Sequence, residues 1–137
     1  MEGQNKNIEI DSFVSKSVLA VCFAGSDRSR YIAEELNNRG YFATSAGVLE
    51  NHNYVTPEDL MNIGIIVFSS INEKNIFDKD RKLKSIVERN HIQIRVLNIT
   101  ESDKNRAHDS GNVQSLKTEI SKQLDSVGLK DLESGNN

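Results

Sequence analysis

Short apolar segments alternate along the chain with longer segments in which apolar side chains recur at helical spacing. Residues 18–21 and 65–68 are continuously apolar, which is typical of parallel strands covered on both faces. We predict four strands from these patterns, at residues 18–21, 41–45, 63–69 and 92–99. The segments between the strands predict helices, because their apolar residues return every three or four positions.

The first predicted helix follows residues 22–29 and has Ile32 and Leu36 on its buried face. Gly40 suits its C-terminal end, because glycine adopts the left-handed conformation that often closes a helix. The charged residues at 78–84 are predicted to form a solvated helix face rather than a binding site. Further helices are predicted at residues 56–62, 72–90 and 113–127.

The alternation of strands and helices predicts an α/β fold, a three-layer sandwich with a four-stranded parallel sheet and helices on both faces. Right-handed crossovers bring the carboxyl ends of all strands to one edge, where such sheets bind ligands. Cys22, residues 45–54, Ser69, Ser70 and residues 100–112 are expected at that edge. The sequence therefore predicts a functional site there.

Composition sets limits on domain number and location. The 137 residues suffice for one domain, at residues 17–128 between polar tails at 1–16 and 129–137. No run reaches the roughly 20 apolar residues of a membrane span, and the first 12 residues lack the apolar core of a signal peptide. The single cysteine excludes an intramolecular disulfide and fits a reducing cytoplasm, so we expect a cytoplasmic protein.

The charge of the chain limits the classes of binding partner that we expect. The net charge is −3 and there is no basic block with interleaved aromatic residues, so nucleic acid is not an expected partner. An acidic balance with a local arginine favours a small anionic group as ligand. We expect no membrane partner, no cofactor and no metal, and the pattern sets no oligomeric state.

The candidate chemistry lies at the turn between the first strand and the first helix. Cys22 ends the strand, and Arg28 and Ser29 follow it in a C-x5-R-S pattern. Backbone N–H groups of such a loop and a helix N-terminus can surround a phosphate, and arginine can hold two of its oxygens. The same positive surroundings favour a thiolate, which is the nucleophilic form of cysteine. Gly25, in mid-loop, allows the backbone angles that such a loop requires.

Residues 18–36 resemble the opening of the low-molecular-weight protein tyrosine phosphatase family. That family has a strand, then C-x5-R-S, then a helix with an Ala-Glu pair, which is Ala33-Glu34 here. The A-T-S-A-G-V segment at residues 43–48 is similar to the family's Ser-Ala-Gly segment. The resemblance covers residues 18–48 most fully and extends, less closely, to residue 99.

The resemblance implies phosphomonoester hydrolysis, on phosphotyrosine above all, through a phosphocysteine intermediate. In it Cys22 resembles the nucleophile, Arg28 the residue that binds the phosphate oxygens, and Ser29 the hydroxyl that hydrogen-bonds the thiolate. Gly25 replaces the family's usual loop asparagine. The residues whose backbone would surround the phosphate are Phe23, Ala24, Gly25, Ser26, Asp27 and Arg28.

The chain also departs from the family. Asp27 replaces the second loop cysteine, which removes the family's protective disulfide and adds a negative charge beside an anion site. Arg30 replaces the usual proline and can offset that charge. The late Asp-Pro motif that supplies the general acid is missing. Asp103 is preferred in its place, because it lies only a few residues past the end of the last predicted strand, and the alternatives are Glu101 and Asp109.

Three other functions remain open from the sequence. C-F-A-G-S-D-R-S also resembles the cysteine loop of phosphotransferase-system IIB domains, whose cysteine accepts and passes on phosphate. Those domains typically lack the arginine. Arsenate reduction ordinarily needs additional cysteines, which this chain does not have. A non-catalytic relative that binds a phosphorylated partner or an oxyanion is the third alternative, because of Asp27 and the missing Asp-Pro.

Overall fold

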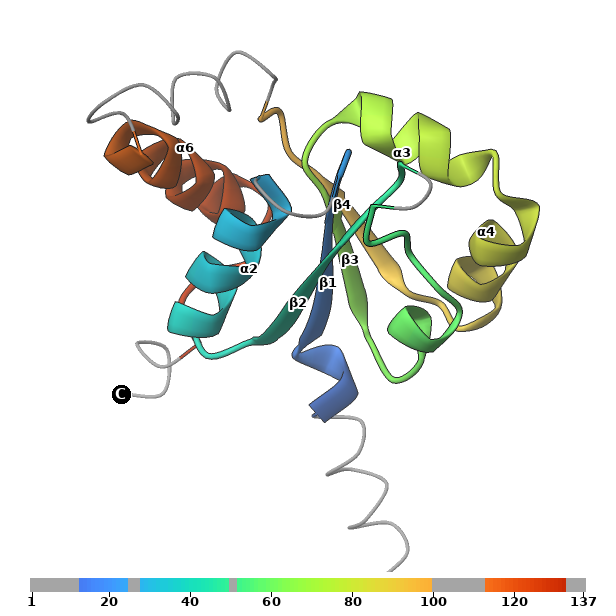
Figure 1. The fold of residues 1–137 in the computed structure, drawn as a ribbon. Helices are drawn as coiled ribbons and strands as arrows, with labels where there is room; N and C mark the ends of the chain where they lie inside the picture. The colour runs from blue at the N-terminus through green and yellow to red at the C-terminus, as the bar shows by residue number, and fades with distance from the viewer. Residues whose placement is uncertain (1–12, 25–27, 50–51, 100–112, 133–137) are drawn as a thin grey trace, which may run out of the picture.

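The computed structural model describes residues 13–24, 28–49, 52–99 and 113–132, and it contains one parallel sheet (Figure 1). The strands are β1 (Ser17–Cys22), β2 (Phe42–Gly47), β3 (Ile65–Phe68) and β4 (Gln93–Val96). Their order is β2-β1-β3-β4, and all three pairings are parallel. The predicted four-stranded parallel sheet is thereby confirmed.

Helices cover both faces of this sheet (Figure 1). Helices α2 (Arg28–Asn38) and α6 (Val113–Ser126) lie on one face. Helices α3 (Ile71–Asp78) and α4 (Arg81–Arg89) lie on the other, with the 3-10 turn η1 (Glu58–Leu60). None of the described helices approaches the roughly 20 apolar residues that a bilayer-crossing helix needs, α6 having 14 residues.

Each face of the sheet forms its own hydrophobic core, because side chains alternate along a strand. Val18, Ala20, Ile65 and Val67 pack with α2 and α6. On the opposite face, Leu19, Val21, Ile66 and Phe68 pack with α3, α4 and η1. β1 and β3 are buried at every position, which explains the continuously apolar runs at 18–21 and 65–68 in the sequence.

The helical pattern at residues 72–90 forms two helices rather than the one predicted. The chain turns at Lys79 and Asp80, and the Asp80 carboxylate accepts a hydrogen bond from the Leu83 N–H at 3.1 Å. Asp80 also accepts a bond from the Tyr54 hydroxyl at 2.9 Å. Aspartate is a strong N-cap residue, so this member of the charge cluster begins α4 instead of lying on a solvated face.

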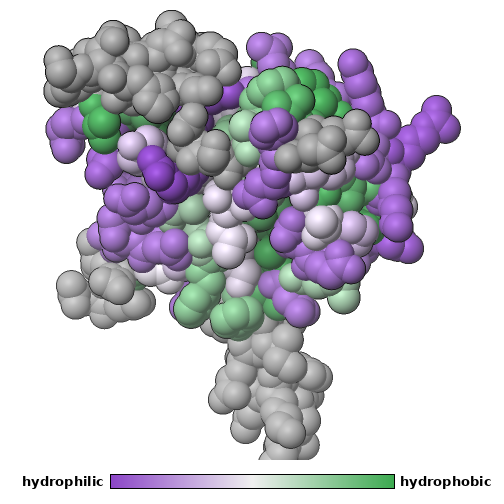
Figure 2. All heavy atoms as spheres, viewed as in Figure 1, coloured by the Kyte–Doolittle hydropathy of each residue, from purple (hydrophilic) through white to green (hydrophobic). Residues whose placement is uncertain are grey.

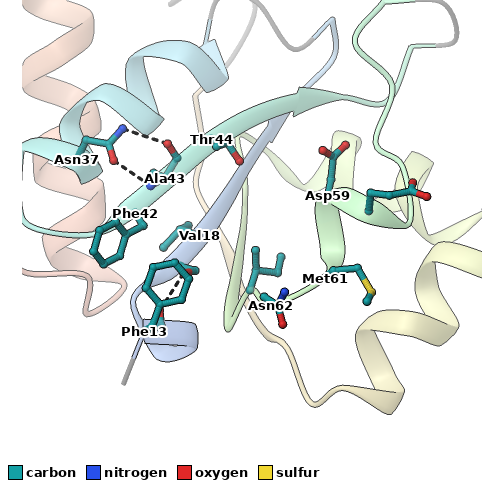
Figure 3. Close-up of a pocket in the computed structure, with 12 residues that line it drawn as sticks. Phe13, Val18, Asn37, Phe42, Ala43, Thr44, Asp59, Met61 and Asn62 are labelled. Atoms are coloured by element: carbon teal, nitrogen blue, oxygen red, sulfur yellow. Dashed lines mark hydrogen bonds between the residues drawn. The ribbon is translucent and has the colours of Figure 1, made fainter. Parts of the chain in front are cut away.

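The outer edge of β2 is closed by side-chain amides. Asn37 donates to the Ala43 carbonyl at 3.0 Å and accepts from the Ala43 N–H at 2.9 Å (Figure 3). Asn53 donates to the Ser45 carbonyl at 3.1 Å. These bonds occupy backbone groups that an unprotected edge strand offers to other chains.

The folded part of the chain is longer at both ends than predicted. Residues 13–15 form a helical turn, and the Phe13 ring lies 4.9 Å from that of Phe42. Gly64 permits the backbone of this turn to approach closely, because a Cβ at residue 64 would lie 2.5 Å from the Val14 carbonyl oxygen. At the other end, Leu129 is buried and the Leu132 N–H donates to the Arg39 carbonyl at 2.8 Å. Residues 1–12 and 133–137 of the predicted tails lie outside the described ranges.

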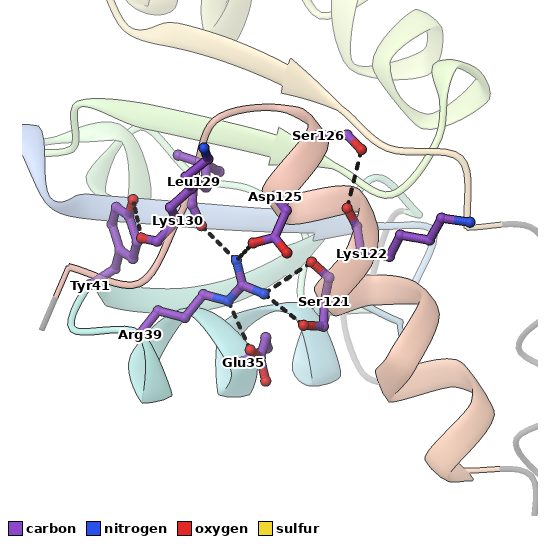
Figure 4. Close-up of polar contacts among 9 residues, drawn as sticks. All are labelled: Glu35, Arg39, Tyr41, Ser121, Lys122, Asp125, Ser126, Leu129 and Lys130. Atoms are coloured by element: carbon purple, nitrogen blue, oxygen red, sulfur yellow. Dashed lines mark hydrogen bonds and ion pairs between the residues drawn. The ribbon is translucent and has the colours of Figure 1, made fainter. Parts of the chain in front are cut away.

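A buried arginine fixes α6 and the residues that follow it (Figure 4). The Arg39 guanidinium donates to the carboxylates of Glu35 and Asp125, both at 2.8 Å, and to the Leu129 carbonyl at 2.9 Å. It also donates to the carbonyl and hydroxyl oxygens of Ser121. Burial disfavours its charge, but the hydrogen bonds and charges of Glu35 and Asp125 outweigh this effect and raise its pKa.

Tyr41 beside this network gives a pH-dependent prediction. Its hydroxyl donates to the Lys130 carbonyl at 3.0 Å, and burial raises its pKa against the opposing charges of Arg39 and Arg95. A folded-state pKa above the unfolded value of about 10 gives stability that is present at lower pH and is lost as pH rises through the folded-state pKa. Wild type should therefore be more stable than Tyr41→Phe by about 1 kcal/mol at neutral pH, and the difference should shrink above about pH 10. Urea unfolding of both proteins across this range measures it, and a constant difference would contradict it.

Candidate functional site

The carboxyl ends of the strands meet at one edge of the sheet, as predicted. Cys22 at the end of β1 is paired with Gly47 at the end of β2, and Phe68 at the end of β3 is paired with Val96. Ser69 continues this edge, because its N–H donates to the Val21 carbonyl at 2.8 Å. Residues 45–49 and 52–54 also lie beside it, whereas the predicted functional loop at 100–112 lies outside the described residues.

Cys22 and Ser29 are in direct contact. The Cys22 thiol donates to the Ser29 hydroxyl oxygen at 3.2 Å, and the two residues are 2% and 0% exposed. Ser29 is the second residue of α2, so this bond places the sulfur beside the first turn of the helix. A helix N-terminus carries partial positive charge, which attracts an anion bound beside it.

Backbone bonds from the end of β2 hold the beginning of the loop. The Phe23 carbonyl accepts from the N–H groups of Val48 and Leu49 at 2.9 and 2.8 Å, and Val48 also donates to the Cys22 carbonyl at 3.1 Å. Val48 belongs to the A-T-S-A-G-V segment on which part of the family resemblance is based. This segment therefore has a structural reason to lie beside the cysteine.

Arg28 extends from the first residue of α2 across the edge of the sheet. Its Nη2 donates to Glu73 of α3 at 2.9 Å, and its Nη1 donates to the carbonyl of Ile99, beyond β4, at 2.8 Å. Arg28 and Glu73 are 3% and 5% exposed, so they form a buried ion pair. The two bonds use two of the five N–H donors of the guanidinium and hold it in one orientation.

Glu73 is the residue of this site that the sequence did not reveal. Ser70-x-x-Glu73 at the start of α3 has the spacing of a capping box, in which both side chains would bond backbone N–H groups. In the structure the Ser70 side chain makes no cap bond, and its hydroxyl donates to the Glu73 carboxylate instead. The other carboxylate oxygen accepts from Arg28. A Ser-x-x-Glu pattern directly after a buried strand was the available signal.

Several predicted site residues lie outside the described ranges. They include three residues of the predicted phosphate-binding loop and all three acid candidates: Gly25, Ser26, Asp27, Glu101, Asp103 and Asp109. Of the predicted loop residues that are described, Phe23 and Ala24 continue directly from Cys22, and Phe23 is exposed. Of the predicted catalytic residues, the structure therefore brings Cys22 and Ser29 into contact, and Arg28 precedes Ser29 as the first residue of α2.

A separate hollow lies at the amino ends of the strands, away from Cys22 (Figure 3). It has a volume of about 450 Å³, and its lining includes Phe13, Ser17, Phe42, Asp59 and Met61. Hydrophilic residues cover most of the face shown in Figure 2, and apolar ones gather in smaller areas, one of them near the start of the strands. None of the predicted site residues within the described ranges lines this hollow.

Comparisons of the chain with models of protein families, with curated proteins and with solved structures found no match. Within the described ranges no three or more His, Cys, Asp or Glu side chains are grouped so that they could hold a metal ion. The side chains described at this site are a buried thiol, a hydroxyl at a helix N-terminus and an arginine paired with a glutamate.

Proposed function

We propose that this protein hydrolyses phosphate monoesters through a phosphocysteine intermediate, with a phosphotyrosine protein or a small phosphomonoester as substrate. The contact between Cys22 and Ser29 at the start of α2 carries this proposal. It places the single thiol of the sequence, a serine hydroxyl and a helix N-terminus at one point, with Arg28 as the first residue of the same helix. These are the groups that attack on a phosphate requires.

In the first step, the Cys22 thiolate attacks phosphorus, so that the S–P bond forms as the bond to the leaving oxygen breaks. The leaving oxygen takes a proton from a general acid, for which Asp103 is proposed with Glu101 and Asp109 as alternatives. In the second step, water attacks phosphorus and breaks the S–P bond. Phosphate leaves, and the same carboxylate takes the proton of the water.

Arg28 and Ser29 would act on different atoms, Arg28 on the phosphate oxygens and Ser29 on the sulfur. The guanidinium of Arg28 would stabilise charge on the equatorial oxygens in the transition state, and Glu73 with the Ile99 carbonyl would hold its plane in position. The Ser29 hydroxyl would donate to the sulfur once the proton has left it. That donation makes the thiolate a better leaving group in the second step.

A second candidate function follows from the Arg28–Glu73 ion pair. Because Glu73 compensates the charge of Arg28, the site attracts an anion less strongly than an unpaired arginine would. This observation favours a protein that binds an oxyanion or a phosphorylated partner without turnover. The phosphocarrier alternative shares the thiol chemistry of the first step only.

Incubation of the wild-type protein with p-nitrophenyl phosphate tests the proposal. A phosphatase should release many equivalents of p-nitrophenol, and orthovanadate, which resembles the transition state, should inhibit the release. A phosphocarrier would release at most one equivalent and keep the phosphate. A non-catalytic relative would release none while phosphate still raised its unfolding temperature, and either of these results would overturn the phosphatase proposal.

A further inference from the structure

Ser69 holds a hydroxyl that makes no hydrogen bond to the residues that the structure describes. The residue is 0% exposed, and its buried Oγ has no hydrogen-bond partner among them. A buried, unpaired hydroxyl costs about 1–3 kcal/mol of stability, which proteins rarely accept without a reason. The function of the neighbouring groups can supply that reason.

Ser69 lies beside Cys22 in the sheet. Val21 is paired with Phe68, the last residue of β3, and continuing this parallel register by one residue puts Cys22 and Ser69 next to each other. The Ser69 backbone keeps this register, because its N–H donates to Val21 and its carbonyl accepts from the Ile99 N–H, both at 2.8 Å. The two residues are therefore neighbours at the carboxyl edge of β1 and β3.

Both side chains lie on the same face. Along β1, Val18 and Ala20 face α2, and alternation places Cys22 on that side, as its bond to Ser29 confirms. Along β3, Ile65 and Val67 face the same helix, so the same alternation places Ser69 there. The thiol of Cys22 thus has one serine above it on α2 and another beside it on the sheet.

We propose that the Ser69 hydroxyl donates a hydrogen bond to the sulfur of Cys22 when that sulfur is a thiolate. While the Cys22 thiol keeps its proton, it donates to Ser29, and its sulfur carries no negative charge that would attract another hydroxyl donor. Once the proton has left, the sulfur becomes an acceptor for both hydroxyls, and the Ser69 hydroxyl turns about its Cα–Cβ bond to reach it. Ser69 is a positioning residue for the thiolate in this role, which rests on the proposed function of the site.

The variant Ser69→Ala tests the proposal in the intact protein. Because the chain has one cysteine, the ultraviolet absorbance of its thiolate can be titrated against pH with Cys22→Ser as the blank. Ser69→Ala should move the midpoint of thiolate formation upward by about one pH unit. Its urea midpoint should equal or exceed that of wild type, because the change removes an unpaired buried hydroxyl.

Ser17→Ala is the matched control. Ser17 is a buried serine at the other end of β1, and its hydroxyl donates to the Phe13 carbonyl at 2.8 Å. Its replacement should lower the urea midpoint and leave the thiolate titration unchanged. The two serines thus separate an effect on the sulfur from an effect on the fold.

A titration of Ser69→Ala that superimposes on that of wild type would overturn the inference. Loss of cooperative unfolding in this variant would overturn it as well, because the hydroxyl would then be needed for the fold. A shifted titration in a protein without phosphatase turnover would support the role of Ser69 and refute the proposed function. Turnover with an unshifted titration would support the proposed function and refute the role of Ser69.

Discussion

Replacement of Cys22 with serine is expected to reduce p-nitrophenyl phosphate hydrolysis by about 10⁴-fold or more. A serine hydroxyl keeps its proton at neutral pH, so the variant lacks the nucleophile on which the proposed mechanism depends. The fold should survive, because serine is close to cysteine in size and can keep the contact with Ser29. Steady-state rates of both proteins under identical conditions measure the effect.

An acid-quench experiment with radiolabelled substrate extends this prediction to the intermediate. Wild-type protein should retain label as phosphocysteine, and Cys22→Ser should retain none. Met61→Leu is a suitable control, because Met61 is exposed and lines the hollow at the opposite end of the sheet. Equal rates in wild type and Cys22→Ser would exclude the cysteine mechanism.

Replacement of Glu73 with glutamine is expected to lower the free energy of unfolding by about 3 kcal/mol. Glutamine keeps the shape of the side chain but removes the negative charge, so the buried guanidinium of Arg28 loses its compensation. Urea denaturation curves of both proteins, fitted with one common m-value, measure this loss. The value lies at the low end for a broken buried ion pair, because the glutamine oxygen can still accept a hydrogen bond.

Phosphate should restore part of the stability that Glu73→Gln loses. If Arg28 binds anions, phosphate replaces the missing charge and raises the urea midpoint of the variant more than that of wild type. Glu35→Gln is the matched control, since Glu35 pairs with another buried arginine, Arg39, away from the site. It should lose less stability, because Glu35 is partly exposed, and phosphate should not favour it over wild type. Equal stabilisation of wild type and Glu73→Gln by phosphate would show that Arg28 does not contact the anion.

Sequence patterns within short segments were sufficient to predict the sheet. β1 and β3 are apolar at consecutive positions because helices cover both of their faces, and that burial leaves a direct trace in sequence. The handedness of parallel crossovers then predicted one common edge for the strand ends. Gly40 was likewise predictable, because the end of α2 requires the left-handed conformation that it adopts, with φ of 99°.

Contacts between distant segments were not predictable. Asp80 looked like one charge among several, and only its position at the break between α3 and α4 makes it a cap. Leu129 and Leu132 follow a helix in a polar stretch, yet they pack because Arg39 binds the end of α6. In both cases the local sequence allows two structures, and packing against another element selects one.

The sequence by itself determined the α/β sheet, the edge at which the carboxyl ends of its strands meet, and the placement of Cys22, Arg28 and Ser29 at a strand-to-helix turn. These features depend on neighbours within a few residues, through alternation, helical spacing and the C-x5-R-S pattern. Only the tertiary structure decided that Arg28 pairs with Glu73, 45 residues away, and with the Ile99 carbonyl, 71 residues away. It also placed the unpaired hydroxyl of Ser69 beside Cys22, because strand register joins residues that no local pattern relates.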